Sequence, residues 1–391
     1  MLKGYRLLDL SSRLPGPLCS LILADLGMEV IRVEPPEHLH KGDLFREIPE
    51  RETPYFPMLN RGKKSVTLNL KSQKGIDIFY KMAEKADVVL EGFRPGVIQR
   101  LGIGWERLRE INPALILASI SGYGQEGAYR GKAGHDLNYI AGTGILWLNA
   151  PRGGGAPVIP PVQIGDIGGG AYPAVIGILA ALIDRKRTGK GRWLDISMLD
   201  GCLFWMGLAM FDWGIGKAIA QGIPPIARGA ANYNVYETRD GGYLALGALE
   251  ENFWRQFCKA VGKPEWIEIY GDEEAMCDTA LINELKALFL KKTRNEWMEV
   301  FKDWDTCLSP VRRLDEAAED EYLKGRDVFR WVSLPDGKRF PVIHFPVGGV
   351  CERGALKEEG PVLGQHNEPF YKEFLGLAEG EIETLRREGV I

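Results

Sequence analysis

The chain has 391 residues, with 49 Lys and Arg against 53 Asp and Glu and an apolar fraction of 45%. Its formal charge of -4 and its sequence pI near 5.9 argue against the basic surface of a general nucleic-acid-binding protein, so we expect no nucleic-acid partner. The six cysteines form no Cys-x-x-Cys pair and have no ligand spacing to histidine, which disfavours a disulfide framework and a metal cofactor such as zinc. A chain of this length is expected to form two or three domains.

Neither the first residues nor the longest apolar run indicates a membrane protein. Met-Leu-Lys-Gly-Tyr-Arg lacks the apolar core of a signal peptide, so we expect a cytoplasmic protein. The longest apolar run, residues 171–183, is shorter than the roughly 18 residues that a membrane span requires. We interpret it as a buried helix and expect no membrane partner.

Strands and helices alternate through the first part of the chain. Strands are predicted at residues 5–10, 29–33, 65–70, 87–90 and 115–120, and helices at 17–26 and 75–85. Such βαβ repeats favour a parallel sheet in a doubly wound α/β domain. The first turn reads Ser-Ser-Arg-Leu-Pro-Gly-Pro instead of Gly-x-Gly-x-x-Gly, which disfavours a nicotinamide or flavin dinucleotide site.

Two further helices are predicted to begin at aspartates. Asp136 precedes an apolar stretch that runs to Trp147, and Asp166 precedes three glycines and the apolar run to Ile183. Both aspartates are typical of N-cap residues. Three glycines near a helix start reduce its stability, so they indicate either close approach of a ligand to the backbone or tight helix packing.

The pattern changes after a predicted strand at residues 191–197. A hairpin is predicted around Arg239-Asp240-Gly241-Gly242, and a smaller α+β domain from about Asn232 to Pro310 would contain it together with two helices. The strands of this hairpin are predicted at residues 233–238 and 243–249, and the two helices at 251–261 and 295–304. A polar connector at 335–338 and a charged helix at 381–388 follow the small domain.

The segment Gly-His-Asp-Leu-Asn-Tyr, at a predicted loop-to-helix junction, offers residues for chemistry. A base at His135 would lie near the amide donors of a helix N-terminus. Alternatively, His135 satisfies a backbone carbonyl and Asp136 only caps the helix. The same alternative holds for Asp166.

Basic residues and glycines gather in two predicted loops. One reads Arg61-Gly62-Lys63-Lys64 and leads into a strand followed by Lys71, and the other reads Glu91-Gly-Phe-Arg-Pro-Gly96 and is followed by Arg100. Loops at the strand ends of an α/β sheet are the usual ligand sites, and guanidinium and ammonium groups suit a polyphosphate. Solvated surface is the alternative interpretation.

Ordered segments across nearly the whole chain resemble the class III CoA-transferase and α-methylacyl-CoA racemase superfamily, and more closely its racemase branch. They include Asp9-Leu-Ser-Ser-Arg-Leu-Pro-Gly-Pro17, Ala24-Asp-Leu-Gly27, Glu91-Gly-Phe-Arg-Pro-Gly96, Gly134-His-Asp-Leu-Asn-Tyr139, Gly165-Asp-Ile-Gly-Gly-Gly170, Gly247-Ala-Leu-Glu250 and Gly360-Pro-Val-Leu-Gly-Gln-His366.

The resemblance implies a Rossmann-like large domain, a smaller α+β domain and an interlocked homodimer. The expected boundaries are 1–200 for the large CoA-binding domain, 201–231 for linker helices, 232–315 for the small domain, and 316–391 for a return connection with C-terminal helices packing on the large domain. It also implies an acyl-CoA substrate from fatty acid metabolism and no cofactor beyond the CoA moiety.

The family's CoA-binding positions fall on Leu68, Lys71, Gly92, Phe93, Arg94, Arg100, Gly134 and Tyr139. One departure concerns a basic residue that some members place after the second strand. That position is Pro35 here, and Arg32 or Arg46 could replace it.

The resemblance leaves the reaction open between two enzymes and a binding protein. In racemases, the histidine at His135 and the aspartate at Asp166 exchange the α-proton on opposite faces, and Glu250 could hydrogen-bond one of them, unless it is only a helix cap. In transferases, the aspartate at Asp136 attacks the thioester as a nucleophile. A non-catalytic acyl-CoA-binding protein would need none of these residues. We therefore expect an α-methylacyl-CoA racemase, with a class III CoA-transferase as the alternative.

Overall fold

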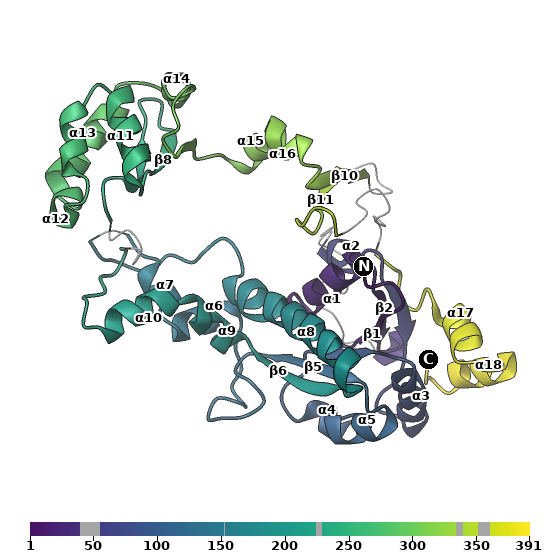
Figure 1. The fold of residues 1–391 in the computed structure, drawn as a ribbon. Helices are drawn as coiled ribbons and strands as arrows, with labels where there is room; N and C mark the ends of the chain where they lie inside the picture. The colour runs from purple at the N-terminus through teal and green to yellow at the C-terminus, as the bar shows by residue number, and fades with distance from the viewer. Residues whose placement is uncertain (40–54, 152, 224–228, 334–338, 351–359) are drawn as a thin grey trace. The chain divides into compact units, whose positions relative to one another are not determined.

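The computed structural model describes residues 1–39, 55–151, 153–223, 229–333, 339–350 and 360–391 (Figure 1). Arg46 and the connector at 335–338 lie outside these residues. The described chain divides into two compact units. The first unit comprises Met1–Ile145, Ile159–Met206 and Asp327–Ile391, and the second comprises Leu146–Val158 and Gly207–Arg326.

A six-stranded parallel sheet forms the centre of the first unit (Figure 1). Its order is β3-β2-β1-β4-β5-β6, and Leu8 of β1 pairs with Ile31 of β2 and Val89 of β4. The predicted parallel α/β fold is thus confirmed. The strands are β1 (Arg6–Asp9), β2 (Glu29–Glu34), β3 (Lys64–Thr67), β4 (Val88–Glu91), β5 (Ile116–Ser121) and β6 (Arg192–Ser197). In this order the chain reverses direction across the sheet between β1 and β4, where α/β proteins bind ligands at the carboxyl ends of the strands.

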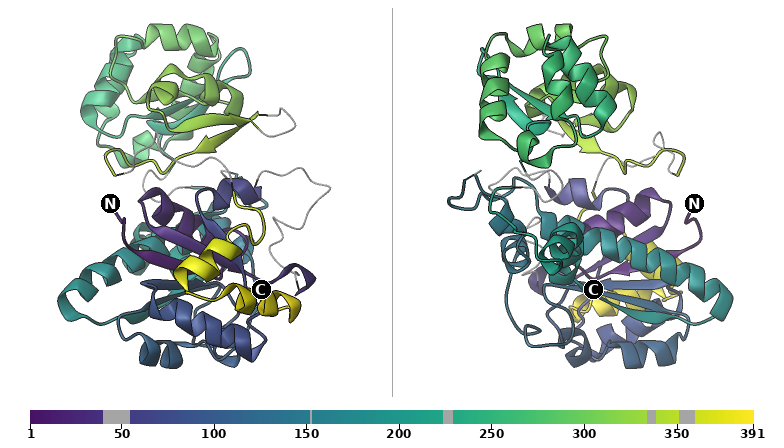
Figure 2. Two further views of the ribbon diagram at one scale, coloured as in Figure 1. Left: turned by 90° about the vertical axis from the view of Figure 1, so that its right-hand side faces the viewer. Right: turned by 60° about the vertical axis from the view of Figure 1, so that its left-hand side comes forward.

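Helices cover both faces of the sheet, which explains why its strands are almost continuously apolar (Figures 1 and 2). Leu8, Val89 and Leu117 face a core formed with α3, α5 and α18, and α1 and α8 pack on the opposite face. The helical elements of this unit are α1 (Pro15–Asp25), η1 (Glu37–Leu39), α2 (Tyr55–Asn60), α3 (Gln73–Glu84), α4 (Val97–Arg100), α5 (Trp105–Ile111), α6 (Asp136–Gly142), η2 (Gly165–Ala171), α8 (Tyr172–Thr188), α9 (Met198–Trp205), α17 (Asn367–Pro369), η5 (Phe370–Phe374) and α18 (Glu379–Arg387), and α7 (Ile145–Leu148) lies at the boundary.

The C-terminal segment is held against β3, the edge strand of the sheet. The N–H of His366 donates to the carbonyl of Ser65 over 2.9 Å, and the side chain of Asn367 bonds both the N–H and the hydroxyl of Thr67. The hydroxyl of Tyr371 donates to the carbonyl of Thr67. These bonds satisfy the exposed edge of the sheet. An antiparallel pair, β10 (Phe329–Ser333) and β11 (Arg339–Ile343), precedes this segment.

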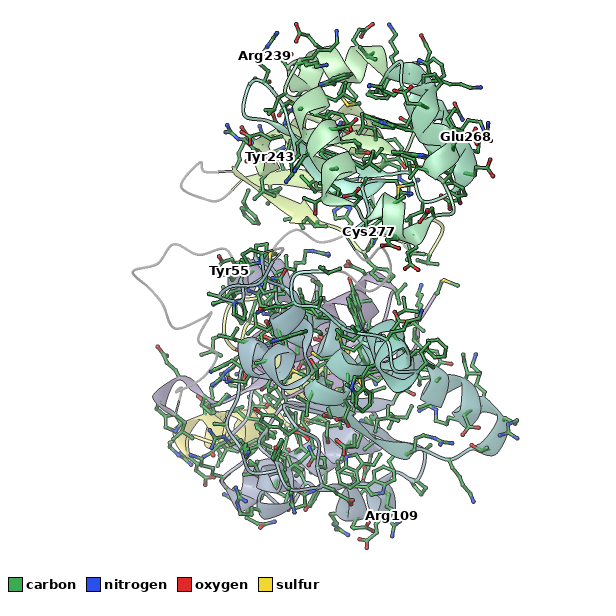
Figure 3. All side chains as sticks on the ribbon, turned by 90° about the vertical axis from the view of Figure 1, so that its left-hand side faces the viewer. Tyr55, Arg109, Arg239, Tyr243, Glu268 and Cys277 are labelled. Carbon is green, nitrogen blue, oxygen red and sulfur yellow. The ribbon has the colours of Figure 1, made fainter. Side chains whose placement is uncertain are left out.

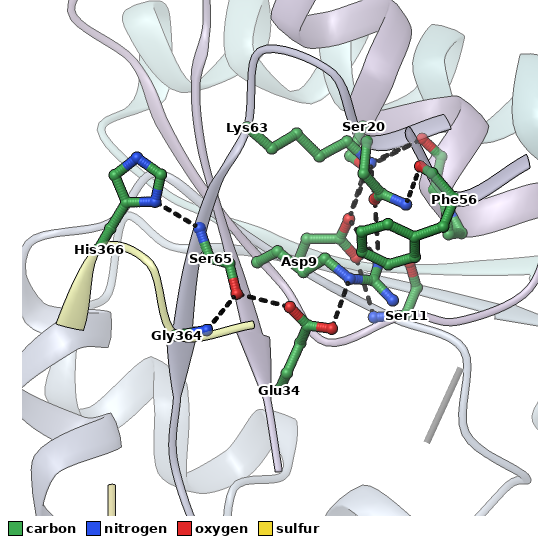
Figure 4. A network of polar contacts seen from close by, with 12 residues as sticks. Asp9, Ser11, Ser20, Glu34, Phe56, Lys63, Ser65, Gly364 and His366 are labelled. Carbon is green, nitrogen blue, oxygen red and sulfur yellow. Dashed lines mark hydrogen bonds and ion pairs between the residues drawn. The ribbon is translucent and has the colours of Figure 1, made fainter. Parts of the chain in front are cut away.

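A buried polar network lies beneath the first strand (Figure 4). The Lys63 ammonium donates to the Ser20 hydroxyl, the Asn60 amide oxygen and the Pro17 carbonyl over 2.7, 2.9 and 2.9 Å, and lies 3.4 Å from the Asp9 carboxylate. Burial raises the pKa of Asp9, but Lys63 and the nearby Arg32 outweigh this effect, so its net pKa is below the usual value. The network therefore holds an ionised carboxylate inside the unit.

One helix among the described residues, the continuous segment Gly165–Thr188 with a mean hydropathy of 1.6, is long and apolar enough to cross a membrane by length and composition. About half of its most apolar window is buried inside the protein. Ala174, Ile178 and Leu182 form the buried face and Ile183 lies on the exposed face. The apolar run predicted as a buried helix is therefore helical, with one face buried.

The second unit has its own antiparallel sheet and aromatic core. The predicted hairpin is confirmed as β7 (Tyr233–Glu237) paired with β8 (Tyr243–Gly247), and β9 (Leu308–Pro310) adds a third strand. Trp254, Phe257 and Phe289 are fully buried in its core. Its helical elements are α10 (Gly207–Gly214), α11 (Glu251–Ala260), η3 (Pro264–Ile269), α12 (Glu273–Met276), α13 (Thr279–Phe289), α14 (Arg294–Val300), α15 (Leu314–Glu319) and α16 (Glu321–Gly325).

Substitution Lys63→Met should lower the free energy of unfolding by about 3 kcal/mol or more, because it removes the nearer of the two cations that pair with the buried Asp9 carboxylate. Urea unfolding followed by circular dichroism measures this. The matched control is Lys74→Met, which removes an exposed ion pair with Glu388 and should change the stability little. Equal effects of the two substitutions would contradict a stabilising role for the network.

Candidate active site

A cavity of about 410 Å³ lies in the first unit, at the carboxyl ends of β1, β4, β5 and β6. This is the place where the sheet order predicts a ligand site. The predicted site residues that line it are Gly92, Phe93, Arg94, Gly134, His135, Tyr139 and Asp166. The structure thus brings both candidate bases and one of the basic loops to a single cavity.

Asp136 does not line this cavity, and its carboxylate is committed to the backbone. Its Oδ1 accepts the N–H groups of Gly165 over 2.5 Å and of Asp166 over 3.1 Å. A carboxylate oxygen that accepts two backbone N–H groups is held in one orientation. Asp136 therefore ties the first turn of α6 to the first turn of η2, and so links the two segments that carry His135 and Asp166.

The two predicted N-caps are wrong by one or two residues. The N-cap of α6 is His135, whose own N–H donates to the Asn138 side chain over 3.0 Å, and Asp136 is the first helical residue. The N-cap of η2 is Ile164, and Asp166 lies inside the first turn. Aspartate favours both N-cap and first-turn positions, so its type alone does not fix the boundary.

The predicted helix from Asp136 to Trp147 is interrupted. It ends at Gly142, because Gly144 adopts a left-handed conformation with φ of 85°, and a short helix follows at Ile145–Leu148. This break is consistent with the common helix-ending role of glycine.

The Asp166 carboxyl is partly buried in the cavity wall. Burial, reinforced by the negative charge of Asp136, raises its pKa to about 6, and the positive charge of Arg13 opposes the rise. A carboxyl with such a pKa can both accept and return a proton near neutrality. The same surroundings raise the pKa of Tyr139 above its usual value, mainly through burial.

His135 is solvent-exposed on the cavity wall, and the residue before it is fixed by two tyrosines. The Tyr139 hydroxyl donates to the Gly134 carbonyl over 2.7 Å, and Tyr123 packs edge-on against Tyr139. A Cβ on Gly134 would lie 2.7 Å from the Tyr123 hydroxyl, so only glycine fits there. The tyrosines thus hold the backbone that presents the imidazole.

The three glycines of η2 are explained by packing rather than by ligand approach. A Cβ on Gly169 would lie 2.4 Å from the carbonyl oxygen of Met198, and one on Gly168 would meet the ring of Trp205 at the same separation. Close contact between η2 and α9 therefore requires small residues. This packing also places Met198 at the cavity.

The loop after β4 forms the basic side of the site. Glu91 is buried at its base and accepts the N–H of Phe93 over 2.7 Å, and burial raises the pKa of this glutamate to about 7. The guanidinium groups of Arg100 and Arg130 both approach Gly96, within 3.3 and 3.5 Å of where its Cβ would lie. These cations and Arg94 suit phosphate groups.

Other predicted residues lie outside the cavity lining. The Leu68 side chain is buried in the core of the first unit, with its N–H bonded to the Glu34 carbonyl, and Lys71 is exposed. Arg32 is buried beside Asp9 and Glu34, so it does not replace the family's basic residue at the exposed Pro35. Arg46, the other proposed replacement, lies outside the described residues.

Glu250 belongs to the second unit, where it is the exposed N-cap residue of α11 and its side chain makes no capping hydrogen bond. Its catalytic role stays a prediction. Within the described ranges, no group of three or more His, Cys, Asp or Glu side chains could hold a metal ion.

Three cavity cations were not predicted as site residues, namely Arg13, Arg130 and Lys132. A signal for Arg13 was its place between the first strand and the Pro-Gly-Pro that opens the next helix. Arg130 and Lys132 precede Gly134 in a glycine-containing loop. Glu91 belongs to the second basic loop of the sequence analysis, and its position at the end of an apolar strand is the pattern that could have indicated a buried carboxylate.

Comparison with known proteins finds similarity over nearly the whole chain. Residues 2–367 match CoA-transferase family III. The α-methylacyl-CoA racemase of Mus musculus is 33% identical over all of this chain and 97% of its own length. The succinyl-CoA–D-citramalate CoA-transferase of Chloroflexus aurantiacus is 32% identical over all of this chain and 98% of its own length.

Solved structures agree with the fold. Rv3272 of Mycobacterium tuberculosis has a TM-score of 0.79 and 28% identity, covering 94% of this chain and 97% of its own. A CAIB/BAIF family protein from Brucella suis has a TM-score of 0.78 and 28% identity, covering 95% of this chain and 98% of its own. The chain therefore belongs to CoA-transferase family III, a family of enzymes whose named relatives here include both a racemase and a CoA-transferase.

Proposed function

We propose that the protein is an α-methylacyl-CoA racemase that interconverts (R)- and (S)-2-methylacyl-CoA by proton transfer between two bases. One observation carries the proposal. His135 and Asp166 line the cavity, whereas Asp136, the nucleophile of the alternative transferase mechanism, is outside the lining and accepts two backbone N–H groups. The similarity to two α-methylacyl-CoA racemases, at 33% identity, also supports the racemase proposal.

In the proposed reaction, one base removes the proton from the α-carbon, and the bonding electrons move onto the thioester oxygen as an enolate. The other base then gives a proton to the opposite face of the same carbon. His135 and Asp166 must together hold one proton, so that one member accepts while the other donates. Because Gly165 and Asp166 give their N–H groups to Asp136, these two amides are not available to the enolate oxygen, and we propose the first amides of α6 as its donors.

Substrate binding would use the basic loop. In this proposal Arg94, Arg100 and Arg130 bind the phosphates of CoA. Arg94 and Phe93 belong to the loop after β4, Arg100 ends α4, and Arg130 lies in the loop before α6. Glu91 keeps this loop in position through its bond to the Phe93 N–H. The proposal needs no cofactor beyond the CoA moiety, and that expectation stays untested.

Substitutions His135→Ala and Asp166→Asn should each lower α-deuterium uptake from deuterium oxide by at least about 100-fold, because each removes one of the two bases. Asp136→Asn should keep most of the exchange, since its amide oxygen can still accept the Gly165 and Asp166 N–H groups. NMR follows the exchange in a single enantiomer of 2-methyldecanoyl-CoA.

The same series distinguishes the alternatives. A class III CoA-transferase would form a new thioester with a free carboxylate, would yield to hydroxylamine trapping at Asp136, and would lose all transfer in Asp136→Asn. A non-catalytic protein would bind acyl-CoA with neither exchange nor transfer. Either result would overturn the racemase proposal.

The pH dependence of exchange supplies a second test. Because the negative charge of Asp136 raises the pKa of Asp166, Asp136→Asn should lower that pKa, and the bell-shaped profile of kcat/KM should move to lower pH. Asp77→Asn, on the exposed face of α3, is the control and should leave the profile unchanged. A profile that stays in place in Asp136→Asn would contradict the charge coupling.

A homodimer is part of the same proposal. Ile183 and Phe204 on the first unit are 72% and 87% exposed, and Phe211 and Trp213 on the second unit are also exposed. Large exposed apolar side chains are typical of interaction surfaces, and a second copy of the chain is the occupant we propose. Sedimentation equilibrium should give twice the chain mass of 43.6 kDa. A monomer at micromolar concentration would contradict the dimer.

A further inference from the structure

Arg13 lies in the loop between β1 and α1 and lines the same cavity as His135 and Asp166. It is one of the few non-glycine residues with a positive φ, at 67°. An arginine rarely adopts this left-handed conformation, which persists only where the surrounding structure enforces it. The conformation and the cavity position together single out Arg13 for a role in the site.

The backbone before Arg13 is fixed by the buried network. Ser11 donates its N–H and its hydroxyl to the Asp9 carboxylate over 2.9 and 2.5 Å, and Asp9 is itself paired with Lys63 (Figure 4). Ser11 also packs closely against Gly16, because a Cβ on Gly16 would lie 2.2 Å from the Cβ of Ser11. Because α1 begins at Pro15, the loop is held on both sides of Arg13.

The charge of Arg13 acts at the reacting end of the cavity. Among the described residues, four cations line the cavity, namely Arg13, Arg94, Arg130 and Lys132. Among them, Arg13 is the one whose charge lowers the pKa of Asp166 and of Tyr139. The other lining arginines, Arg94 and Arg130, are the ones proposed to bind the CoA phosphates, so Arg13 is the lining arginine whose charge acts on Asp166.

The guanidinium of Arg13 makes no hydrogen bond or ion pair within 4.0 Å with any residue that the structure describes. An arginine presents a planar fork of N–H donors that matches a carboxylate, and a neutral hydrocarbon chain offers it no acceptor. The cavity therefore carries an uncommitted carboxylate-binding group beside its proposed bases.

We infer that Arg13 binds a carboxylate on the acyl group, so that the preferred substrates are 2-methylacyl-CoA thioesters whose acyl chain ends in a second, free carboxylate. The inference rests on the proposed racemase function and defines its substrate class. Arg13 acts here on specificity, whereas His135 and Asp166 move the proton.

The test compares 2-methyladipyl-CoA, with its thioester next to the methyl branch, and 2-methylheptanoyl-CoA, in which an ethyl group replaces the free carboxylate. The wild type should show a kcat/KM for α-deuterium uptake at least about tenfold higher for the carboxylated substrate. Arg13→Asn should abolish this preference by slowing the carboxylated substrate much more than the other, because the accompanying change in the Asp166 pKa affects both substrates alike, and Arg13→Lys should keep part of the preference. Asparagine is used because it tolerates a positive φ.

Arg109→Gln is the control, because Arg109 lies on α5 at the periphery of the first unit, where it pairs with Glu106 (Figure 3). It should retain the wild-type preference. Equal kcat/KM values for the two substrates in the wild type would overturn the inference. Equal losses for both substrates in Arg13→Asn would also overturn it, since they would place Arg13 on the thioester or the enolate instead.

A binding measurement separates this inference from the racemase proposal. Titration calorimetry with S-(5-carboxypentyl)-CoA and S-heptyl-CoA, which have no thioester, should show at least about tenfold tighter binding of the carboxylated thioether, lost in Arg13→Asn. If this preference is found but no acyl-CoA exchanges its α-proton, the racemase proposal fails and carboxylate binding by Arg13 stands. If exchange occurs but both thioethers bind equally, the inference about Arg13 fails alone.

Discussion

The site depends on the two hydrogen bonds that the Asp136 carboxylate accepts from the N–H groups of Gly165 and Asp166. They join the start of α6 to the start of η2. The two proposed bases lie beside these bonds, because His135 directly precedes Asp136 and Asp166 donates the second N–H. The same carboxylate raises the pKa of Asp166 by its charge, after the larger effect of burial. One residue outside the cavity lining thus contributes both to the position of the two proposed bases and to the protonation of Asp166.

A second constraint comes from the order of the parallel sheet. Because the order reverses between β1 and β4, their carboxyl ends open a crevice, which the loops carrying Arg13 and Phe93 line. Buried carboxylates hold both loops: Asp9 bonds Ser11 in the first and Glu91 bonds Phe93 in the second. Buried charge is costly unless it is paired: Lys63 and Arg32 pair with Asp9, whereas burial raises the pKa of Glu91 to about 7.

The sequence was sufficient to predict the parallel sheet, the hairpin of the second unit and the positions of His135 and Asp166 in one cavity. Periodicity and strand length carry the information on the sheet and the hairpin, because strands buried on both faces must be apolar. The common site of His135 and Asp166 was predicted from the resemblance to the family. Helix starts were placed less well, since aspartate suits both an N-cap and a first turn, as Asp136 and Asp166 show. The glycines after Asp166 left ligand approach and packing equally open, and only the position of Trp205 and Met198 in space decides for packing. Arg13 was missed because its importance depends on φ and on a cavity that no local pattern reveals.

The most direct measurement is a crystal structure with a 2-methylacyl-CoA analogue in which a methylene group replaces the thioester sulfur. The proposed mechanism predicts that the α-carbon lies between His135 and Asp166, with the imidazole and the carboxyl on opposite faces. It also predicts that Asp136 keeps its bonds to the Gly165 and Asp166 N–H groups. An Asp136 carboxylate turned away from these amides and placed against the carbonyl carbon of the analogue would contradict the account and identify a transferase.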